Sequence, residues 1–281
     1  MTPSRHQKKK PFLIKKASGE IEPFSREKLE RSLSMTGASR VLVERVIDRV
    51  AKKVSSGIST QKLFRMAFQL LQKEARYLAA RYSLKRAVMS LGPSGYPFEK
   101  FVGALMQKQG YETQVGVILE GACTTHEVDV VAIKKNHRRL VECKYHNHEG
   151  IKCDVKVPLY VYARSLDLKN NSPSELVNEF WLVTNTKFTA DAVRYGSCVG
   201  LNLLSWDYPE GRSLKLMIEK EEVHPITCLT TLKRNQKNKL LKNNVVLCHE
   251  ILDNPNLLRE ISLKEAQIKR VVKEVTDLIE L

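Results

Sequence analysis

Several features of membrane and secreted proteins are missing from the 281-residue sequence. No stretch approaches the roughly 18–20 consecutive apolar residues that a transmembrane helix requires. The first residues, MTPSRHQKKKPFLIKK, are basic and lack the apolar core of a secretory signal peptide. The sequence therefore predicts a cytoplasmic protein that neither spans nor partners a membrane.

Closely spaced cysteine pairs are also missing. The six cysteines are scattered singly along the chain, and none forms a CxxC pair. In a chain of this size, such scattering is typical of reduced thiols in a cytoplasm. The pattern argues against a small protein held together by a disulfide framework.

Acidic residues are few in relation to basic ones. The chain has 47 Lys and Arg against 31 Asp and Glu, a formal net charge of +16. This excess favours polyanionic partners, with nucleic acid first and acidic membrane surfaces second. The alternative on charge alone is a merely soluble basic protein. At 42% hydrophobic and 28% charged residues, the composition is that of a globular protein.

Turn-forming residues divide the chain into a tail and three predicted domains. Residues 1–11 are a basic flexible tail, and residues 12–92 read as a β-hairpin followed by helices. The cluster GPSGYP, residues 92–97, ends this part. In residues 96–210 strands alternate with helices, as in a mixed α/β sheet, and residues 211–281 are helical. We therefore expect a multidomain α+β protein with a small all-α domain at its carboxyl end.

The segment HEVDVVAIKKNHRRLVECKYHN, residues 126–147, predicts two apolar strands joined by a polar turn in KNHR. Asp129 lies in the first strand, and Glu142 and Lys144 lie two positions apart in the second, on one face. A turn in KNHR would bring Asp129 close to residues 142–144.

Two carboxylates close together repel one another unless a cation joins them. A hard divalent ion with oxygen ligands, above all Mg²⁺, is the natural partner. The Lys144 amine would then orient a water or stabilise charge on a phosphate. The alternative is a Glu–Lys pair at a solvated sheet edge, with Asp129 exposed.

The surrounding segments resemble the PD-(D/E)xK nuclease superfamily and, within it, the Mrr-like restriction endonucleases. The resemblance covers residues 96–207 and includes a helix with an acid, the strand pair above, and the ending WLVTNTKFTADAVRYGSCVGLNLLSWD. It implies cleavage of DNA with Mg²⁺ or Mn²⁺ held by Asp129 and Glu142. It also implies Lys144 as the catalytic lysine, Glu99 as an ancillary acid near the metal, and a role in defence against foreign DNA.

A zinc site is an alternative use of the same region. The segment CKYHNHEGIKC offers two cysteines and two histidines, namely Cys143, His146, His148 and Cys153. Their spacing is not a common one for structural zinc, and Cys143 should point to the opposite face from Lys144. We therefore expect exposed or DNA-facing histidines rather than a zinc centre.

The segment IKKASGEIEPFSREKLERSL, near the amino end, resembles the ATP-cone, a nucleotide-sensing module of ribonucleotide reductases and their repressor. The resemblance covers residues 12–92 and implies a regulatory ATP or dATP. Lysines beside a tight glycine turn can cradle phosphates, and no Walker-type loop for hydrolysis is visible. The alternative is a small helical domain with a solvated basic rim. The implied nucleotide-binding residues are Ile14, Lys16, Glu22, Lys28 and Thr60.

The last segment resembles a degenerate helix-hairpin-helix unit, similar to the carboxy-terminal domain of RNA polymerase alpha subunits. Such units contact phosphates through backbone amides and nearby basic side chains. The run KRNQKNKLLK, residues 233–242, supplies five bases and no acid. A helical interaction or dimerisation module is the alternative. The predicted DNA contacts are Lys233, Arg234, Lys237, Lys239 and Lys242.

Two functions from different classes follow from these patterns. The first is a Mg²⁺-dependent endonuclease that acts on double-stranded DNA under the control of adenine nucleotide, as a homo-oligomer if it cuts both strands. The second is a catalytically inert, nucleotide-responsive DNA-binding regulator. RNA as the substrate is a third, weaker alternative.

Overall fold

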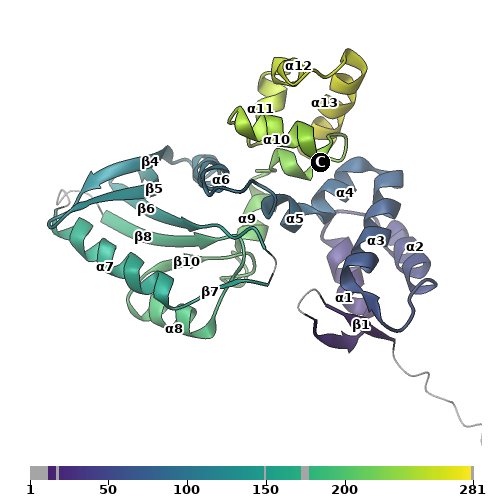
Figure 1. Cartoon of the computed structure of the whole chain (residues 1–281), viewed down its shortest axis with the longest axis horizontal. Helices are drawn as coiled ribbons and strands as arrows, with labels where there is room; N and C mark the ends of the chain where they lie inside the picture. The colour runs from purple at the N-terminus through teal and green to yellow at the C-terminus, as the bar shows by residue number, and fades with distance from the viewer. Residues whose placement is uncertain (1–11, 17–18, 149, 172–176, 280–281) are drawn as a thin grey trace, which may run out of the picture. The chain divides into compact units, whose positions relative to one another are not determined.

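The computed structural model describes all residues except 1–11, 17–18, 149, 172–176 and 280–281. The predicted basic tail therefore lies outside the described residues. The chain divides into two compact units, Met1–Tyr82 and Ser83–Leu281, whose elements are labelled in Figure 1.

The first unit is a small sheet covered by helices. Strands β1 (Leu13–Lys15) and β2 (Ile21–Pro23) form the expected antiparallel hairpin, and β3 (Ile58–Ser59) adds in parallel on the other side of β1. The helices are α1 (Arg26–Ser34), α2 (Arg40–Ala51), α3 (Thr60–Glu74) and α4 (Arg76–Tyr82).

The segment STQKLFRMAFQLLQKEARYLAARYSLKRAVMSLG, residues 59–92, reads in the sequence as one long helical stretch, but the structure interrupts it. Ala75 adopts an extended conformation, with φ −153° and ψ 131°, and ends α3. The chain then starts α4, from which Leu78 and Ala79 pack into the hydrophobic core of this unit. The break is a product of tertiary packing, because local propensity alone favours a continuous helix here.

The second unit contains a five-stranded mixed sheet in the order β10-β8-β6-β5-β4. The first three strands along the chain pair antiparallel, while β8 and β10 run parallel to β6. A two-residue turn suffices between β5 and β6, whereas the parallel strands are joined by helical crossovers. The strands are β4 (Glu112–Glu120), β5 (Thr125–Lys134), β6 (His137–Lys144), β8 (Val177–Thr184) and β10 (Asn202–Leu204).

Helices cover both faces of this sheet. Helix α6 (Tyr96–Lys108) packs against β4 and β5 on one face, and α7 (Lys156–Asn170) and α8 (Ala190–Cys198) pack on the other (Figure 1). The side chains of β6 alternate between these two layers, as a strand requires. Arg139 accordingly reaches Met106 of α6, whereas Glu142 reaches α7.

The remaining elements are a short strand pair and the helices outside the sheet. Strands β7 (Lys152–Cys153) and β9 (Lys187–Phe188) form a small parallel pair that the sequence did not indicate. Among the described residues, the regular elements of the carboxy-terminal region are all helices. Its helices, together with α5 at the start of the unit, are α5 (Leu84–Val88), α9 (Leu214–Lys220), α10 (Arg234–Lys242), α11 (Cys248–Asp253), α12 (Asn256–Glu260) and α13 (Glu265–Ile279).

The predicted fold class, mixed α+β with a helical carboxy-terminal part, is confirmed. The first unit ends at Tyr82, and α5 belongs to the second unit, whereas the sequence predicted a boundary at residue 92. A further division near residue 210 stays a prediction. Among the described residues, no helix has the length and apolar character required to cross a membrane.

Candidate active site

Strands β5 and β6 separate inside the sheet and form a fork. Their pairing ends at Val130 opposite Val141. From there β5 continues beside β4, and β6 continues beside β8. Asp129 and Glu142 are the first residues past the last pair, and Lys144 follows on β6. Past the fork, the two strands are no longer joined by hydrogen bonds between their backbones, so side chains can lie between them.

Asp129 is held in this fork by the neighbouring strand. Its Oδ2 accepts the backbone N–H of Cys143 at 2.6 Å. Burial, followed by the charges of Glu142 and Glu99, raises the pKa of Asp129 to about 7, although the bond from Cys143 opposes the shift. Glu142 and, from α6, Glu99 therefore lie close enough to Asp129 for their charges to disfavour its ionisation.

Glu99 contributes to the same group of acids from α6. The pKa of Glu99 is raised by burial and then by the charges of Glu127 and Glu142. A nearby cation would relieve this repulsion, because it favours the charged form of each carboxyl group.

Glu142 is held by two side chains of α7. Tyr160 donates its hydroxyl to Oε1 at 2.7 Å, and Arg164 donates Nη1 to Oε2 at 2.5 Å. Arg164 also donates Nη1 to the backbone carbonyl of Glu127 at 3.2 Å. The pKa of the Tyr160 hydroxyl is raised by burial and by Glu142, so the phenol keeps its proton and remains a donor.

Lys144 lies two positions after Glu142 and thus on the same face of β6. Its charge, after the larger effect of burial, lowers the pKa of His146. Within the described parts of the chain, no salt bridge joins Lys144 to Asp129 or Glu142, and the cation that contacts Glu142 is Arg164. The structure thus places the two strand acids next to one another at the fork, with Glu99 near enough for its charge to act on Asp129. The role of the Lys144 amine stays a prediction.

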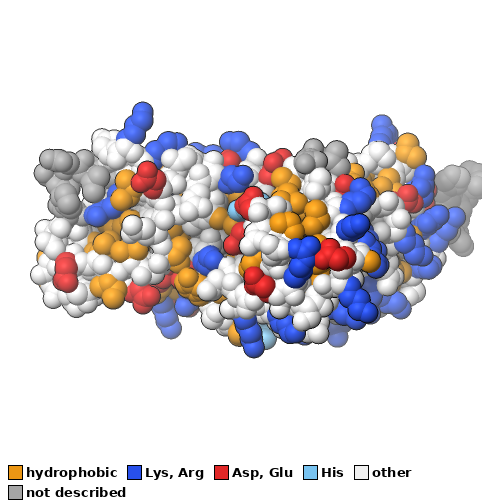
Figure 2. Space-filling view, turned by 90° about the horizontal axis from the view of Figure 1, so that it is seen from above, with side chains coloured by type: hydrophobic (Ala, Val, Ile, Leu, Met, Phe, Trp, Pro, Cys, Tyr) orange, Lys and Arg blue, Asp and Glu red, His pale blue; other side chains and the backbone are white. Residues whose placement is uncertain are grey.

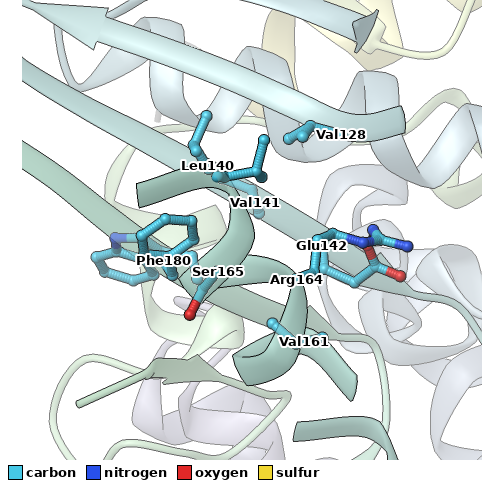
Figure 3. Close-up of a pocket in the computed structure, with 10 residues that line it drawn as sticks. Val128, Leu140, Val141, Glu142, Val161, Arg164, Ser165 and Phe180 are labelled. Carbon is cyan, nitrogen blue, oxygen red and sulfur yellow. The ribbon is translucent and has the colours of Figure 1, made fainter. Parts of the chain in front are cut away.

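A pocket opens beside Glu142 between the sheet and α7 (Figure 3). Figure 3 shows the side chains of Glu142 and Arg164 next to each other at one side of it, with apolar side chains making up most of the remainder. Apolar walls strengthen charge interactions by excluding water. The residues that line it are Val128, Leu140, Val141, Glu142, Val161, Arg164, Ser165, Leu168, Phe180 and Trp181.

The donor atoms in the fork suit magnesium better than zinc. Among the described residues, no three or more His, Cys, Asp or Glu side chains are grouped so that they could hold a metal. A structural zinc site needs four such ligands, so the alternative that uses Cys143, His146, His148 and Cys153 lacks support. Mg²⁺ is commonly held by one or two carboxylates and several waters, which Asp129 and Glu142 can provide.

Three residues of this site were missed by the sequence interpretation. Tyr160 and Arg164 occur four apart in a segment expected to be helical, and this spacing was the available signal. Gly116 lies on β4 between the pairs Val115–Val130 and Val117–Val128, and therefore across from Asp129. Its φ of +67° is a conformation that glycine adopts easily.

The predicted nucleotide site of the first unit contains a charge cluster of two lysines and two acids, in which Lys16 also contacts Glu20 Oε2 at 3.1 Å. Lys16 and Lys28 each contact Glu22 Oε2 at 3.0 Å. The hydrogen bond from Lys16, and then that from Lys28, lowers the pKa of Glu22. Ile14, in contrast, is buried in the core of this unit, and Thr60 is the half-buried first residue of α3.

The predicted DNA contacts lie on and next to α10. Four of the five, all except Lys237, are exposed. Lys237 instead donates its amine to the backbone carbonyl of Thr227 at 2.7 Å, and burial lowers its pKa. Its amine therefore contacts the backbone within the domain and does not lie exposed for a DNA phosphate. Basic side chains are spread over the face seen in Figure 2 and alternate with fewer acids.

Two protein families match parts of this chain. The restriction endonuclease family of the Mrr type matches residues 92–208, and the family described as AF1548-like, C-terminal matches residues 224–279. An uncharacterized protein from Archaeoglobus fulgidus is 33% identical over 176 residues, which are 62% of this chain and 98% of that protein. The chain belongs to the AF1548-like family. Its strand fork lies within the part that matches the restriction endonucleases, and the resemblance to Mrr-like enzymes is thereby confirmed.

Solved structures extend the comparison. The crystal structure of a protein of unknown function, AF1548, is 32% identical, with a TM-score of 0.55, over 66% of this AF1548-like chain and 99% of that protein. Can2 from Sulfobacillus thermosulfidooxidans, solved in complex with cyclic tetra-adenylate, is 13% identical, with a TM-score of 0.33, over 72% of this chain and 64% of Can2.

Proposed function

We propose that this AF1548-like protein is a metal-dependent DNA endonuclease with its active site in the strand fork. The observation that carries the proposal is the strand fork of a restriction endonuclease domain, where Asp129 and Glu142 directly follow the last β5–β6 pair and the charge of Glu99 also acts on Asp129. Mutually repelling, half-buried carboxylates are typical of sites built for a divalent cation. Asp129 and Glu142 would hold Mg²⁺ or Mn²⁺, with Glu99 as an ancillary acid.

The side chains of the fork have separable roles in such a reaction. A bound metal would polarise the scissile phosphate and lower the pKa of a coordinated water. The Cys143 N–H fixes Asp129, and Tyr160 orients Glu142. Lys144 Nζ, on the face of Glu142, would orient the attacking water or neutralise charge that develops on the phosphate.

Phosphate contacts outside the fork would hold the duplex. Lys233, Arg234, Lys239 and Lys242 are exposed, and their charges are part of the net charge of +16 of the chain. Such contacts are independent of base sequence and weaken with salt. Such contacts are the ones that the helix-hairpin-helix resemblance of the last segment implies.

Adenine nucleotide would regulate the enzyme through the first unit. Lys16 and Lys28 converge on a single carboxylate, Glu22, and two lysines so placed can transfer to the phosphates of ATP or dATP. We expect Glu22 to limit nucleotide affinity until the lysines exchange partners. A shift in DNA cleavage or binding on addition of ATP or dATP, lost in Lys16→Ala, would support this part.

The central test is nicking of supercoiled plasmid in the presence of Mg²⁺ or Mn²⁺. We expect Asp129→Asn and Lys144→Ala to lower the cleavage rate by at least about a hundredfold, since metal and acid–base groups contribute on that scale. The matched control is Asp191→Asn, an exposed acid of α8. Equal nicking by all four proteins would show that the cleavage comes from elsewhere.

A second function is favoured by the hydrogen bonds that already occupy Glu142. Both of its oxygens accept hydrogen bonds from α7, as expected in a nuclease fold that binds DNA without cutting it. A catalytically inert, nucleotide-responsive DNA-binding regulator would bind duplex in a salt-sensitive way and respond to ATP. It would cleave neither DNA nor RNA with any divalent metal.

A further inference from the structure

Two side chains of α7 end on the same carboxylate. Tyr160 and Arg164 lie four residues apart, so they project from one face of the helix. One donates to Oε1 and the other to Oε2 of Glu142, at 2.7 and 2.5 Å. We call this pair the α7 clamp. Its two members differ in a property that matters to a metal site, namely charge.

The tyrosine is compatible with a metal on Glu142. Its hydroxyl is neutral, and a carboxylate offers about four lone-pair sites, so one hydrogen bond leaves room for a metal bond. The arginine is not compatible to the same degree. Its guanidinium is always charged and would repel a divalent ion bound to the same carboxylate.

Arg164 has another acceptor and access to solvent when it releases Glu142. Its Nη1 already contacts the backbone carbonyl of Glu127, at 3.2 Å, and its side chain is 29% exposed. A guanidinium that gives up the carboxylate therefore keeps one acceptor and gains water for its other N–H groups. The exchange requires side-chain rotation and no unfolding of α7.

We propose that Arg164 is an internal counter-cation that occupies Glu142 until a divalent metal displaces it, while Tyr160 keeps Glu142 oriented. This inference rests on the proposed endonuclease function and adds to it a competition between Arg164 and the metal for Glu142. Arg164 and Tyr160 act as positioning residues, because they work through Glu142. The arginine stabilises the metal-free acids and lowers the affinity for metal, so occupancy of the site depends on the metal concentration.

The test is Mn²⁺ binding to the full-length protein, measured through the electron paramagnetic resonance signal of the free ion. We expect Arg164→Gln to bind Mn²⁺ about tenfold more tightly than the wild type, because one unit charge beside a divalent ion is worth on the order of a factor of ten even in a water-like dielectric. Arg164→Lys should return the affinity toward the wild type. Tyr160→Phe should change it by less than about threefold, since no charge is removed.

Arg194→Gln is the matched control, because Arg194 is an exposed arginine of α8 whose partner is Asp191. Its Mn²⁺ affinity should equal that of the wild type. Asp129→Asn separates the two proposals, because it should abolish binding if the fork is the metal site. Asp129-dependent binding by the wild type together with unchanged or weaker binding by Arg164→Gln would overturn the clamp alone. No Mn²⁺ uptake by the wild type or by Arg164→Gln would overturn both proposals.

A second measurement follows the wild-type protein and does not depend on Arg164→Gln. Arginine Nε–Hε signals can be followed by nuclear magnetic resonance during titration with Mg²⁺, with the Arg164 signal assigned from its absence in Arg164→Lys. Displacement predicts that the Arg164 signal shifts in step with metal binding while that of Arg194 stays in place. A stationary Arg164 signal at saturating Mg²⁺ would overturn the clamp, even if Arg164→Gln failed to fold.

Discussion

At the fork, the glycine at position 116 of β4 is required by its backbone conformation and not by lack of space. Gly116, across from Asp129, has φ +67°, and an added Cβ would meet no atom closer than 3.9 Å. Space is therefore available at this position, and the backbone conformation alone favours glycine. The residue-scale constraint is conformational, as expected where a strand bends.

This constraint leads to a prediction for Gly116. Replacing it with Ala should lower the free energy of unfolding by about 1–2 kcal/mol, the cost of a left-handed conformation for a residue with a Cβ. Gly116→Asn is the matched variant and should lose less, because Asn tolerates that conformation better. Urea denaturation of the three proteins provides the comparison. Equal loss in both variants would mean that the side chain, rather than φ, is the problem.

Whole elements are fixed by contacts that reach from one to another. Helix α7 not only supplies the clamp but also holds the connection between β4 and β5. The carboxylate of Asp167 accepts the backbone N–H groups of Cys123 and Thr124, at 2.7 and 3.3 Å, and lies 2.8 Å from His126 Nε2. One helix thus positions both an acid of the fork and the loop that leads into β5.

The Asp167 contacts predict how stability depends on pH. The hydrogen bond with His126, followed by those with Cys123 and Thr124, lowers the pKa of Asp167 to about 2. In an unfolded chain this group titrates near 4. Its contribution to stability is therefore fully present above about pH 4 and is lost as the pH falls through about 2.

We expect Asp167→Asn to remove this dependence. Its free energy of unfolding should fall less steeply than that of the wild type between about pH 4 and pH 2, because the group that takes up a proton on unfolding is gone. Asp191→Asn, on the surface of α8, should retain the slope of the wild type. Urea titrations at several acidic pH values measure the three slopes. Parallel slopes in all proteins would contradict the assignment of the shift to Asp167.

At the scale of the molecule, charge rather than shape predicts the partner. The excess of 16 positive charges is distributed over the chain, and α10 contributes exposed bases that are not used within the fold. Counterion release then makes DNA affinity fall with salt in proportion to the number of phosphates contacted.

The salt dependence yields a prediction for the carboxy-terminal helices. Lys239→Gln with Lys242→Gln should reduce the slope of log affinity against log salt by about 1–2, since each phosphate contact contributes about 0.9. The control is Lys52→Gln with Lys53→Gln, which removes the same charge from exposed positions of the first unit. Fluorescence anisotropy with labelled duplex at several salt concentrations measures both. An equal reduction by the two double variants would indicate that net charge, and no particular surface, binds DNA.

Local patterns were sufficient for the elements and for part of the site. The helical spacing of Val43, Val46, Ile47, Val50 and Val54 predicts one helical face. All five are buried, and the first four lie in α2, which ends at Ala51, before Val54. The alternation and polar turn of residues 126–147 predict the hairpin β5–β6, which the structure contains. The spacing also placed Asp129 near Glu142, because a short turn sets the register of a hairpin.

The partners of these acids could not be predicted in the same way. Arg164 and Tyr160 reach Glu142 because α7 crosses back over the sheet, and the crossing angle of a helix follows from packing across the whole layer. The extended conformation of Ala75 has the same kind of cause. Periodicity reports which face of an element is buried, and it contains no information on which other element will cover that face.

The sequence by itself therefore determined the fold class, the basic charge and the pair of acids on adjacent strands, since composition and short-range register depend on neighbours along the chain. Only the tertiary structure decided that the strands part at Asp129 and that a guanidinium contacts Glu142. Those contacts join segments that are far apart in the chain, and they depend on how complete layers of helices and strands pack together.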